Sequence, residues 1–272
     1  MEEIAFAKLN LALHVRAREP DGYHRIETLF AFAEDGDLLA VAEAEGMSLH
    51  VTGQFASALV AETDNLVLRA AEALRLRFGV TRGAALVLDK RLPVASGIGG
   101  GSADAAAALR LLNRFWGLDA EEKLLLGIAA GLGADVPACV RSETVRGEGR
   151  GDRLLPIDGS MLSGTPMLLV NPGVPVSTPE VFKGWDGIDR GPLGHDPLVG
   201  RNDLEAAAAR LAPEIELVLA MLRTLPGVRI ARMSGSGATC FALFASEADR
   251  DRASASVAAA QPHWWRLASR LR

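Results

Sequence analysis

A glycine-rich segment that leads straight into a helical pattern constrains the fold of this chain more than any other feature. Four of the five residues from Gly97 to Gly101 are glycine. Glycine loses more conformational freedom on folding than any other residue, so such a cluster does not serve stability. Ser102 stands at the expected N-cap of a helix that Gly117 closes. One apolar face of this helix is formed by Ala105, Leu109, Leu112 and Trp116.

A loop of this kind suits a phosphate group. Backbone N–H groups and the helix dipole at an N-terminus attract anions, and glycine lets the backbone approach them closely. Lys90 and Arg91 add positive charge just before the loop. The pattern is not a Walker A loop, since no lysine follows the last glycine, and Ser102 occupies the third glycine position of G-x-G-x-x-G. A plain glycine-rich turn is the alternative, but the adjoining helix favours phosphate binding.

Composition argues against several classes of protein. The 272 residues carry 29 Lys and Arg against 34 Asp and Glu, a net charge of −5, without the basic block of a dedicated nucleic-acid binder. Apolar runs are too short and too glycine-rich to span a bilayer, and the acidic N-terminus is not that of a signal peptide. Cys139 and Cys240 lack a partner spacing, which predicts a cytoplasmic protein without disulfides, and the histidines lack metal-binding spacings.

Strands are expected in clusters rather than in strict alternation with helices, which favours an α+β fold with mixed or antiparallel sheets. Residues 4–15 alternate with period two, so Lys8 and Asn10 share the less apolar strand face. An irregular stretch at 158–166 predicts two subdomains, residues 1–158 and 159–272. Other expected elements are strands at 26–33, 37–44, 47–52 and 83–89, a helix capped by Asp64 or Asn65 and ended by Gly79, and helices at 119–133 (capped by Asp119) and 247–260.

Several segments carry a family resemblance. The string "PVASGIGGGSADAAA" from Pro93 resembles the ATP-binding motif of the GHMP kinase superfamily, and "MSGSGATCFALF" (233–244) resembles its third motif. Within that superfamily the chain resembles the kinases of 4-diphosphocytidyl-2-C-methyl-D-erythritol, in order and over most of its length. The segments that carry this resemblance are "FAKLNLALHVRAREPDGYHRIETLF" (6–30), "GLGADVPACV" (131–140), "NPGVPVSTPEVF" (171–182) and "NDLE" (202–205).

The resemblance implies a reaction, a fold and a set of ligands. It implies ATP-dependent phosphorylation of the 2-hydroxyl of 4-diphosphocytidyl-2-C-methyl-D-erythritol, a step of non-mevalonate isoprenoid biosynthesis. ATP would bring Mg²⁺, since no carboxylate cluster in the sequence demands a protein-built metal cage. The implied fold has two subdomains with an ATP cleft between them. The small-molecule substrate is the only partner expected, with no nucleic acid, membrane or protein partner inferred.

Two residues are assigned to catalysis by the resemblance. Asp135 would accept the hydroxyl proton, and Lys8 would stabilise the developing charge. A helix cap is the alternative for Asp135, and a solvated strand lysine is the alternative for Lys8. Asp104 is expected to be a favourable acid in the first turn of a helix rather than a magnesium ligand.

The remaining site residues are also implied by the resemblance. An aromatic ring at Tyr23 would stack on the cytosine, His24 would bind its edge, and Phe182 would cover its other face, although Phe182 also suits ordinary core packing. Further substrate contacts are expected from Asn10 and Thr178. The expected ATP-binding residues are Asn65, Lys90, Pro93, Val94, Ala95, Ser96, Gly97, Ile98, Gly99, Gly100, Gly101, Ser102 and Ala103, with Gly235, Ser236 and Gly237 on the phosphate side.

Two other functions remain open at this point. Another GHMP kinase, acting on homoserine or a mevalonate derivative, would not need Tyr23 and His24, because those substrates offer no base to stack. A nucleotide-binding relative without catalytic activity would not need to keep both Lys8 and Asp135.

Overall fold

The computed structural model describes residues 1–59, 64–194, 196 and 199–272. The chain forms two compact units, each discontinuous in sequence. Two long strands, β1 (Glu2–Arg18) and β2 (His24–Ala42), contribute to both units. The single break predicted between residues 158 and 159 stays a prediction. Unit 1 comprises residues 1–8, 35–94 and 99–142, and unit 2 comprises residues 9–34, 95–98 and 143–272.

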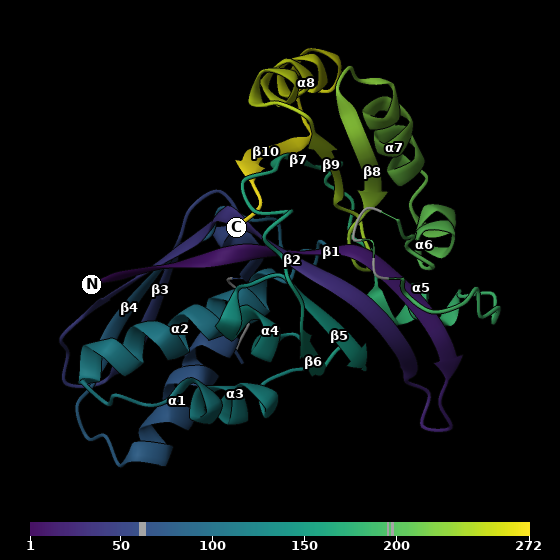
Figure 1. Ribbon diagram of the computed structural model, residues 1–272. Coiled ribbons are helices and arrows are strands. Elements are labelled where there is room, and N and C mark those ends of the chain that lie inside the picture. The colour runs from purple at the N-terminus through teal and green to yellow at the C-terminus, as the bar shows by residue number, and fades with distance from the viewer. Residues whose placement is uncertain (60–63, 195, 197–198) are drawn as a thin grey trace. The chain divides into compact units, whose positions relative to one another are not determined.

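Unit 1 contains a small mixed sheet (Figure 1). β3 (Met47–Thr52) runs parallel to β4 (Ala84–Asp89), and β4 runs antiparallel to the second half of β2. The apolar alternation of β4 buries every second residue, Ala84, Leu86 and Leu88. Strands 47–52 and 83–89 are therefore where the sequence predicts them, within a residue at each end.

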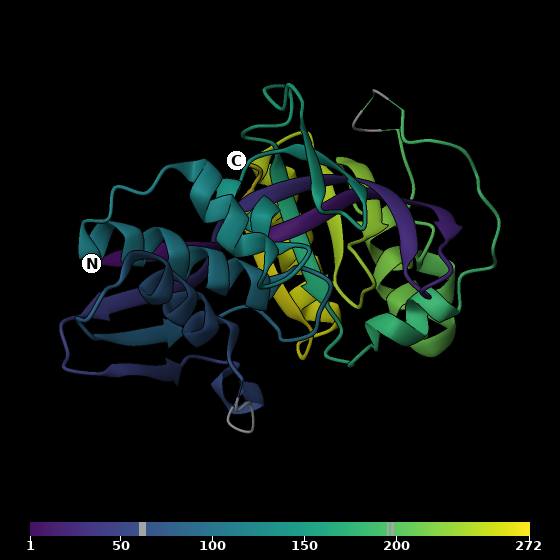
Figure 2. The same cartoon turned by 90° about the horizontal axis from the view of Figure 1, so that it is seen from below.

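Four α-helices complete unit 1 within its described residues. α1 (Leu66–Phe78) and α2 (Gly100–Trp116) contact each other, and both run alongside the sheet in Figures 1 and 2. The Asn65 side chain caps α1 as predicted, and Gly79 ends it with φ of 63°. α2 buries an unbroken run from Ala103 to Leu109, and its many alanines let neighbouring elements approach on all sides. The other two α-helices are α3 (Glu122–Ala130) and α4 (Val136–Arg141), and η1 (Ala56–Leu59) is a 3₁₀ helix.

Two predicted helix starts are wrong. α2 begins at Gly100 with Gly99 as its N-cap, so Ser102 lies inside the first turn. α2 thus begins with Gly100 and Gly101, although glycine has a low helix propensity. Asp119 does not cap α3, whose N-cap is Glu121; Asp119 instead has φ of 48° in the turn before it, a conformation that aspartate tolerates better than most residues.

One strand stands where the sequence predicts two. The polar segment around Asp35 and Gly36 is not a turn, because β2 runs through it. A side chain at Gly36 would bring its Cβ to 1.9 Å from the Ala5 carbonyl oxygen. Glycine at this position therefore marks close approach of β1 rather than the end of a strand.

Unit 2 has an antiparallel four-stranded sheet in the order β10–β7–β9–β8. Alternate residues of β7 and β9 face α7 and α8 in one apolar core, to which Leu13, Val15 and Ile26 of β1 and β2 also belong. Pro213 separates α6 from α7. The bounds are β7 Pro166–Asn171, α6 Glu205–Leu211, α7 Glu214–Thr224, β8 Val228–Met233, β9 Cys240–Phe244, α8 Glu247–Ala260 and β10 Trp265–Arg270.

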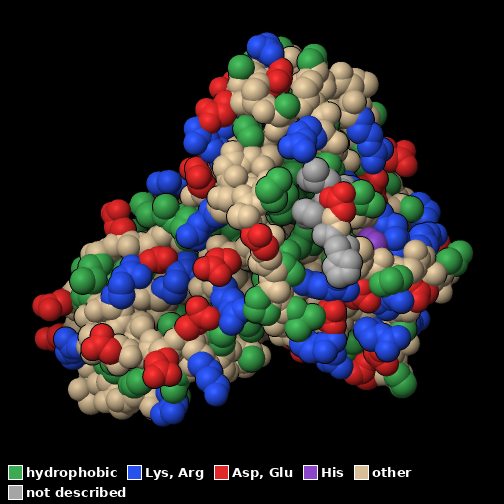
Figure 3. Space-filling view, in the orientation of Figure 1, with side chains coloured by type: hydrophobic (Ala, Val, Ile, Leu, Met, Phe, Trp, Pro, Cys, Tyr) green, Lys and Arg blue, Asp and Glu red, His purple; other side chains and the backbone are tan. Residues whose placement is uncertain are grey.

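The first half of β2 carries a second group of strands in unit 2. β5 (Val145–Gly149) pairs antiparallel with β2 and also with β6 (Arg153–Pro156), with which it forms a hairpin. The short helix α5 (Thr178–Lys183) follows β7. None of the helices formed by the described residues has the length and apolar character that crossing a bilayer requires. The face seen in Figure 3 intermixes basic and acidic side chains.

The buried face of α1 can be tested with a matched pair of leucines. Leu74 is fully buried, whereas Leu76 in the same helix is 75% exposed. We expect Leu74→Ala to lower the free energy of unfolding by about 2–5 kcal/mol, through lost burial and a cavity. Leu76→Ala is expected to change it by less than about 0.5 kcal/mol. Urea denaturation measures both, and equal effects would contradict this packing.

Candidate active site

Lys8 and Asp135, the two residues predicted for catalysis, lie in contact within unit 1. Lys8 stands on β1, and its Nζ is 3.0 Å from Oδ2 of Asp135. The side chain of Lys8 is 4% exposed, whereas that of Asp135 is 38% exposed. A buried ammonium is costly without an opposite charge, so the carboxylate stabilises it. The arrangement fixes the lysine and leaves the carboxylate open on one side.

Asp135 occupies the N-cap position of α4, but its side chain makes no capping hydrogen bond. Pro137 near the start of this short helix suits a first turn, where no backbone donor is needed. The carboxylate is thus directed to Lys8 and not to the helix backbone. Cys139 lies further along the helix, and burial raises the pKa of its thiol to about 12. It therefore stays protonated at neutral pH and offers no nucleophile.

The glycine-rich loop is divided between the units. Pro93, Val94 and the residues from Gly99 onward belong to unit 1, whereas Ala95, Ser96, Gly97 and Ile98 belong to unit 2. Within unit 2, the Ser96 carbonyl accepts a hydrogen bond from Thr239 N at 3.1 Å, and the Gly97 carbonyl accepts one from Ser234 Oγ at 2.9 Å.

The second glycine segment, Gly235–Gly237, packs directly against this part of the loop. A Cβ at Gly97 would lie 2.4 Å from the Ser234 carbonyl oxygen, and one at Gly235 would lie 2.8 Å from the Gly97 carbonyl oxygen. Both glycines also have positive φ, of 79° and 56°. Their lack of side chains therefore lets two backbone segments touch, which brings two predicted ATP-binding segments together.

Lys90 lies in a buried ionic cluster beside the loop. Its Nζ donates to Asp37 Oδ2 at 2.5 Å and to Asp104 Oδ2 at 2.6 Å, and Lys90 is 1% exposed. The other oxygen of Asp37 accepts from the backbone N–H groups of Arg91, at 2.5 Å, and Leu92, at 2.8 Å. The cluster thereby joins β2, the segment after β4 and the N-terminal part of α2. In the structure the Lys90 ammonium is paired with the carboxylates of Asp37 and Asp104. Its contact with ATP stays a prediction.

The prediction that Asp104 is an acid in the first turn of a helix is wrong, because α2 begins at Gly100 and its first turn contains no acidic residue. Oδ1 of Asp104 is buried and has no hydrogen-bond partner among the described residues. Burial raises the pKa of Asp104 to about 7, and the nearby Asp37 adds to this while Lys90 opposes it. Two carboxylates thus share one ammonium. No signal in the sequence points to Asp37, because its partners lie 53 residues away or more.

His24 and Phe182, two residues predicted to bind the substrate, lie together in unit 2. Their ring centroids are 5.2 Å apart, and the indole of Trp185 stands edge-on to His24 at 5.7 Å. His24 opens β2, and Phe182 lies in α5. Sequence reasoning missed Trp185, which lies just beyond the end of α5. Burial and the charge of Arg18 lower the pKa of His24, which favours a neutral imidazole.

Tyr23 has a different surrounding from His24. Tyr23 is 57% exposed, and the Arg150 guanidinium lies 3.8 Å from its ring centroid. Asp21 binds both neighbours, since it accepts from Tyr23 N at 3.1 Å and pairs with Arg150. The predicted stacking residue is therefore held in a small charged cluster, and Arg150 was missed because the hairpin turn that carries it is remote in sequence.

Asn10 and Thr178 lie with the second glycine segment in unit 2. Asn10 is buried; its backbone N–H donates to Ser234 Oγ at 3.1 Å and its Nδ2 to Thr28 Oγ1 at 2.7 Å. Thr178 Oγ1 is 2.7 Å from Ser236 Oγ. Asn65, by contrast, is engaged in capping α1, with its Oδ1 2.9 Å from Val67 N. The structure thus groups Asn10, Thr178 and the segment at 234–237.

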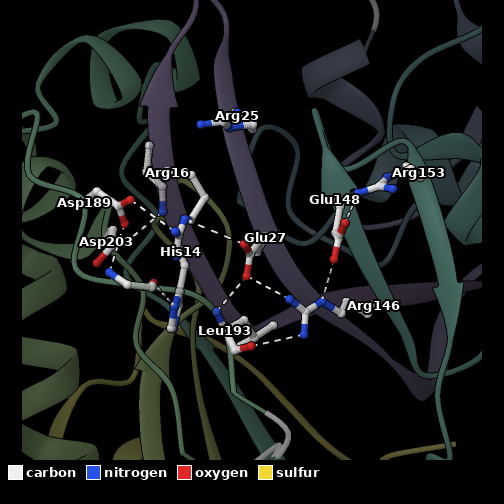
Figure 4. A network of polar contacts seen from close by, with 12 residues as sticks. His14, Arg16, Arg25, Glu27, Arg146, Glu148, Arg153, Asp189, Leu193 and Asp203 are labelled. Carbon is white, nitrogen blue, oxygen red and sulfur yellow. Dashed lines mark hydrogen bonds and ion pairs between the residues drawn. The ribbon is translucent and has the colours of Figure 1, made fainter.

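A network of charges that the sequence did not predict holds an irregular segment on the strands of unit 2 (Figure 4). Glu27 pairs with Arg146 at 2.8 Å and accepts from Leu193 N at 2.7 Å. His14 Nδ1 lies 3.2 Å from the Gly191 carbonyl oxygen, and burial, then the charge of Arg201, lowers the pKa of His14. The loop after α5 is thereby tied to β1, β2 and β5.

Comparison with known proteins identifies the class. The family model described as the GHMP kinases N terminal domain matches residues 65–143, and that described as GHMP kinases C terminal matches residues 194–263. A mevalonate kinase structure from Methanococcus jannaschii, 11% identical with a TM-score of 0.71 over 100% of this chain and 98% of that one, shares the fold. The fold and the matched models define a GHMP kinase, an enzyme that uses ATP.

Curated relatives narrow the class. The chain is 59% identical to 4-diphosphocytidyl-2-C-methyl-D-erythritol kinase of Rhizorhabdus wittichii, over 99% of this chain and 94% of the relative. It is 51% identical to the same kinase of Sphingopyxis alaskensis, over 100% and 99%. A crystal structure of 4-(cytidine 5'-diphospho)-2C-methyl-D-erythritol kinase superposes with a TM-score of 0.85 at 34% identity, over 100% and 99%. The chain belongs to the family of 4-diphosphocytidyl-2-C-methyl-D-erythritol kinases.

The raised pKa of Asp104 makes a prediction about stability and pH. In the folded state this carboxyl has a pKa of about 7 and binds a proton below that pH, whereas its ordinary pKa is 3.8. Its contribution to stability is therefore fully present below about pH 4 and lost as the pH rises through 7. Asp104→Asn cannot ionise, so the stability of the wild type relative to this variant should fall between pH 5 and 8.5.

Urea denaturation at several pH values within that range, about 5 to 8.5, measures the difference. Asp64→Asn is the control, because Asp64 is 75% exposed and pairs only at 3.6 Å with Arg69. A difference between wild type and Asp104→Asn that does not vary with pH would contradict the raised pKa of Asp104.

Proposed function

We propose that this chain transfers the γ-phosphoryl group of ATP to the 2-hydroxyl of 4-diphosphocytidyl-2-C-methyl-D-erythritol, giving the 2-phosphate and ADP. The observation that carries the proposal is the buried Lys8 ammonium held 3.0 Å from the half-open carboxylate of Asp135. Relatives at 59% and 51% identity bear the name of this kinase. Homoserine and mevalonate kinases are alike in fold at 18% and 11% identity, which says nothing of the acceptor.

In the proposed mechanism, Asp135 accepts the proton of the acceptor hydroxyl. The hydroxyl oxygen then forms a bond to the γ-phosphorus, and the bond between that phosphorus and the β,γ-bridging oxygen breaks, leaving its electron pair on ADP. Lys8 lies beside the carboxylate and balances negative charge on the attacking oxygen and the phosphoryl group. Because Lys8 is buried and paired, its ammonium needs little reorganisation during the reaction.

The phosphates of ATP are proposed to bind at residues 93–103, where α2 begins. The N–H groups in the first turn of a helix have no acceptor within the helix, and the dipole adds positive potential there. Gly100 and Gly101 form this first turn without side chains. The segment Gly235–Gly237 and the cap residue Asn65 complete the proposed nucleotide contacts, and Lys90 would act through charge from within its cluster.

Mg²⁺ is proposed as the companion of ATP. Over the described part of the chain, no group of three or more His, Cys, Asp or Glu side chains is placed to hold a metal ion. This finding fits an Mg²⁺ ion held mainly by the phosphate oxygens of ATP. The half-exposed carboxylate of Asp135 could supply a protein ligand. When bound, Mg²⁺ offsets the negative charge of the phosphates.

The cytidine end of the substrate is proposed to bind at His24, Phe182 and Tyr23. A neutral imidazole offers one donor and one acceptor, which suits the edge of cytosine. Phe182 offers a ring next to it, and Tyr23 an exposed ring held by Arg150. Asn10 and Thr178 are proposed to bind the diphosphate or the erythritol hydroxyls, since both lie with the Ser234–Gly237 segment.

The deciding experiment measures ADP release with MgATP and separate acceptors: the cytidyl substrate, homoserine, mevalonate and galactose. Release with the cytidyl substrate alone is expected. Release with another acceptor would leave the GHMP fold intact but overturn the proposed substrate. ATP binding without release for any acceptor would instead indicate a nucleotide-binding protein without kinase activity.

Asp135→Asn is expected to lower kcat by about 10²–10⁴-fold, because the amide cannot accept the hydroxyl proton. The KM for ATP should change much less. Glu122→Gln is the matched control, since it removes the carboxylate of an ion pair with Arg141 in the same unit, at 3.1 Å. Steady-state kinetics gives both constants, and similar kcat values for Asp135→Asn and Glu122→Gln would argue against the proposed base.

Phe182→Leu is expected to raise the KM for the cytidyl substrate by about tenfold, because a leucine cannot stack on a base. The KM for ATP should stay within about twofold, since ATP does not use this ring. Phe115→Leu offers the control, because Phe115 is also half-buried but lies in unit 1. An unchanged KM for the cytidyl substrate would contradict the proposed stacking and indicate that Phe182 serves only core packing.

A further inference from the structure

Gly99 faces the side chain of Lys8, within unit 1. A Cβ built at Gly99 would lie 2.7 Å from Lys8 Cε, 3.2 Å from its Cβ and 3.4 Å from its Cδ. The Lys8 side chain therefore runs across the position that a side chain at Gly99 would fill. Its far end then reaches Asp135, 3.0 Å away.

The neighbouring Gly100 faces a lysine as well. A Cβ there would lie 3.0 Å from Nζ of Lys90, the ammonium that joins Asp37 to Asp104. The start of α2 thus lies between two buried lysines. At these two positions the absence of a side chain is explained by lysine packing on the protein side, independently of any phosphate.

We propose that Gly99 is a positioning residue for phosphoryl transfer, because its missing side chain leaves the path along which Lys8 reaches Asp135. This inference rests on the proposed function, in which Lys8 stabilises the charge of the reaction. Lys8 Cβ is anchored to β1, so relief of a clash at Gly99 must come from the outer part of the side chain. Cε is bonded directly to Nζ, and its displacement moves the ammonium away from the carboxylate.

The other end of the same helix supplies a matched control. Gly117, the C-cap of α2, has φ of 64°, against 62° for Gly99. A Cβ at Gly117 meets nothing within 4 Å. Gly99→Ala and Gly117→Ala therefore carry the same backbone strain, and only the first places an atom in the path of Lys8.

We expect Gly99→Ala to lower kcat by about a hundredfold, the cost of an ångström-scale misplacement of a catalytic group. Gly117→Ala should stay within about twofold of the wild type in kcat while its denaturation midpoint falls as much as that of Gly99→Ala. In a Lys8→Met background, Gly99→Ala should lower kcat no further, since the two changes remove the same contribution. A similar kcat loss for both glycine variants, or a further loss in the Lys8→Met background, would overturn the proposal.

A second readout does not depend on activity. The rate of Lys8 acetylation, followed by mass spectrometry of the Lys8 peptide, should rise several-fold in Gly99→Ala and stay unchanged in Gly117→Ala. An unchanged rate in Gly99→Ala would overturn the proposal. If Lys8→Met alone keeps the wild-type kcat, the proposed role of Lys8 fails, and the acetylation rate still decides whether Gly99 positions its side chain.

Asparagine variants cover the case in which alanine prevents folding. Asparagine adopts positive φ more readily than alanine and still introduces a Cβ. Gly99→Asn and Gly117→Asn are therefore compared by the same kinetics and labelling, with the same outcomes expected and the same outcomes contradicting the proposal.

Discussion

The burial of the Lys90 ammonium between Asp37 and Asp104 is the interaction on which unit 1 depends. It connects β2, the chain after β4 and the N-terminal part of α2, three elements that local sequence alone would not hold together. Buried charges are tolerated only when their partners are in place, so this cluster penalises any arrangement in which one element shifts. The beginning of α2, which lies over the cluster, is held to a fixed position as a result. The Lys8 side chain packs against Gly99 at the start of α2 and pairs with Asp135, so a fixed helix start also fixes this pair.

A second set of interactions organises unit 2 with little charge. Hydroxyl and amide groups form a chain from Thr28 through Asn10 to Ser234 and the Gly97 carbonyl. Each partner is buried or nearly so, and a missing link would leave a polar group without compensation. The two glycine segments can meet only because neither carries a side chain at the contact. Glycine thus has two different uses in the same loop: close contact between backbones at residue 97 and room for a lysine at residue 99.

Much of the fold could be predicted from local signals. Asn65 and Gly79 delimit α1, Pro213 separates two helices, and the alternation in β4 is plain. Local rules failed where residues distant in sequence determine the backbone conformation. Gly36 suggests a turn in the sequence, but in the structure it lies within β2, where Ala5 approaches it closely. Gly100 and Gly101 are helical despite their low helix propensity. Lys8 and Asp135 were predicted through family resemblance, since nothing local pairs residues so far apart. Asp37, Arg150 and Trp185 gave no such signal because their roles depend on neighbours that only the folded chain supplies.

The bridge between Ala33 and Leu271 has a consequence for synthesis. Strand β2 is made early, yet the backbone of Ala33 pairs with Leu271, and Phe32 O accepts from Arg272 N at 2.9 Å. A ribosome makes the chain from its N-terminus, so these groups of β2 have no native partner until all the helices that the described residues form have been translated. Unpaired strand backbone is a template for wrong pairing. The backbone groups of Phe32 and Ala33 therefore reach their native partners only after residues 43–270 have been made, and a β2 strand that forms earlier stays open to wrong pairing at these two residues.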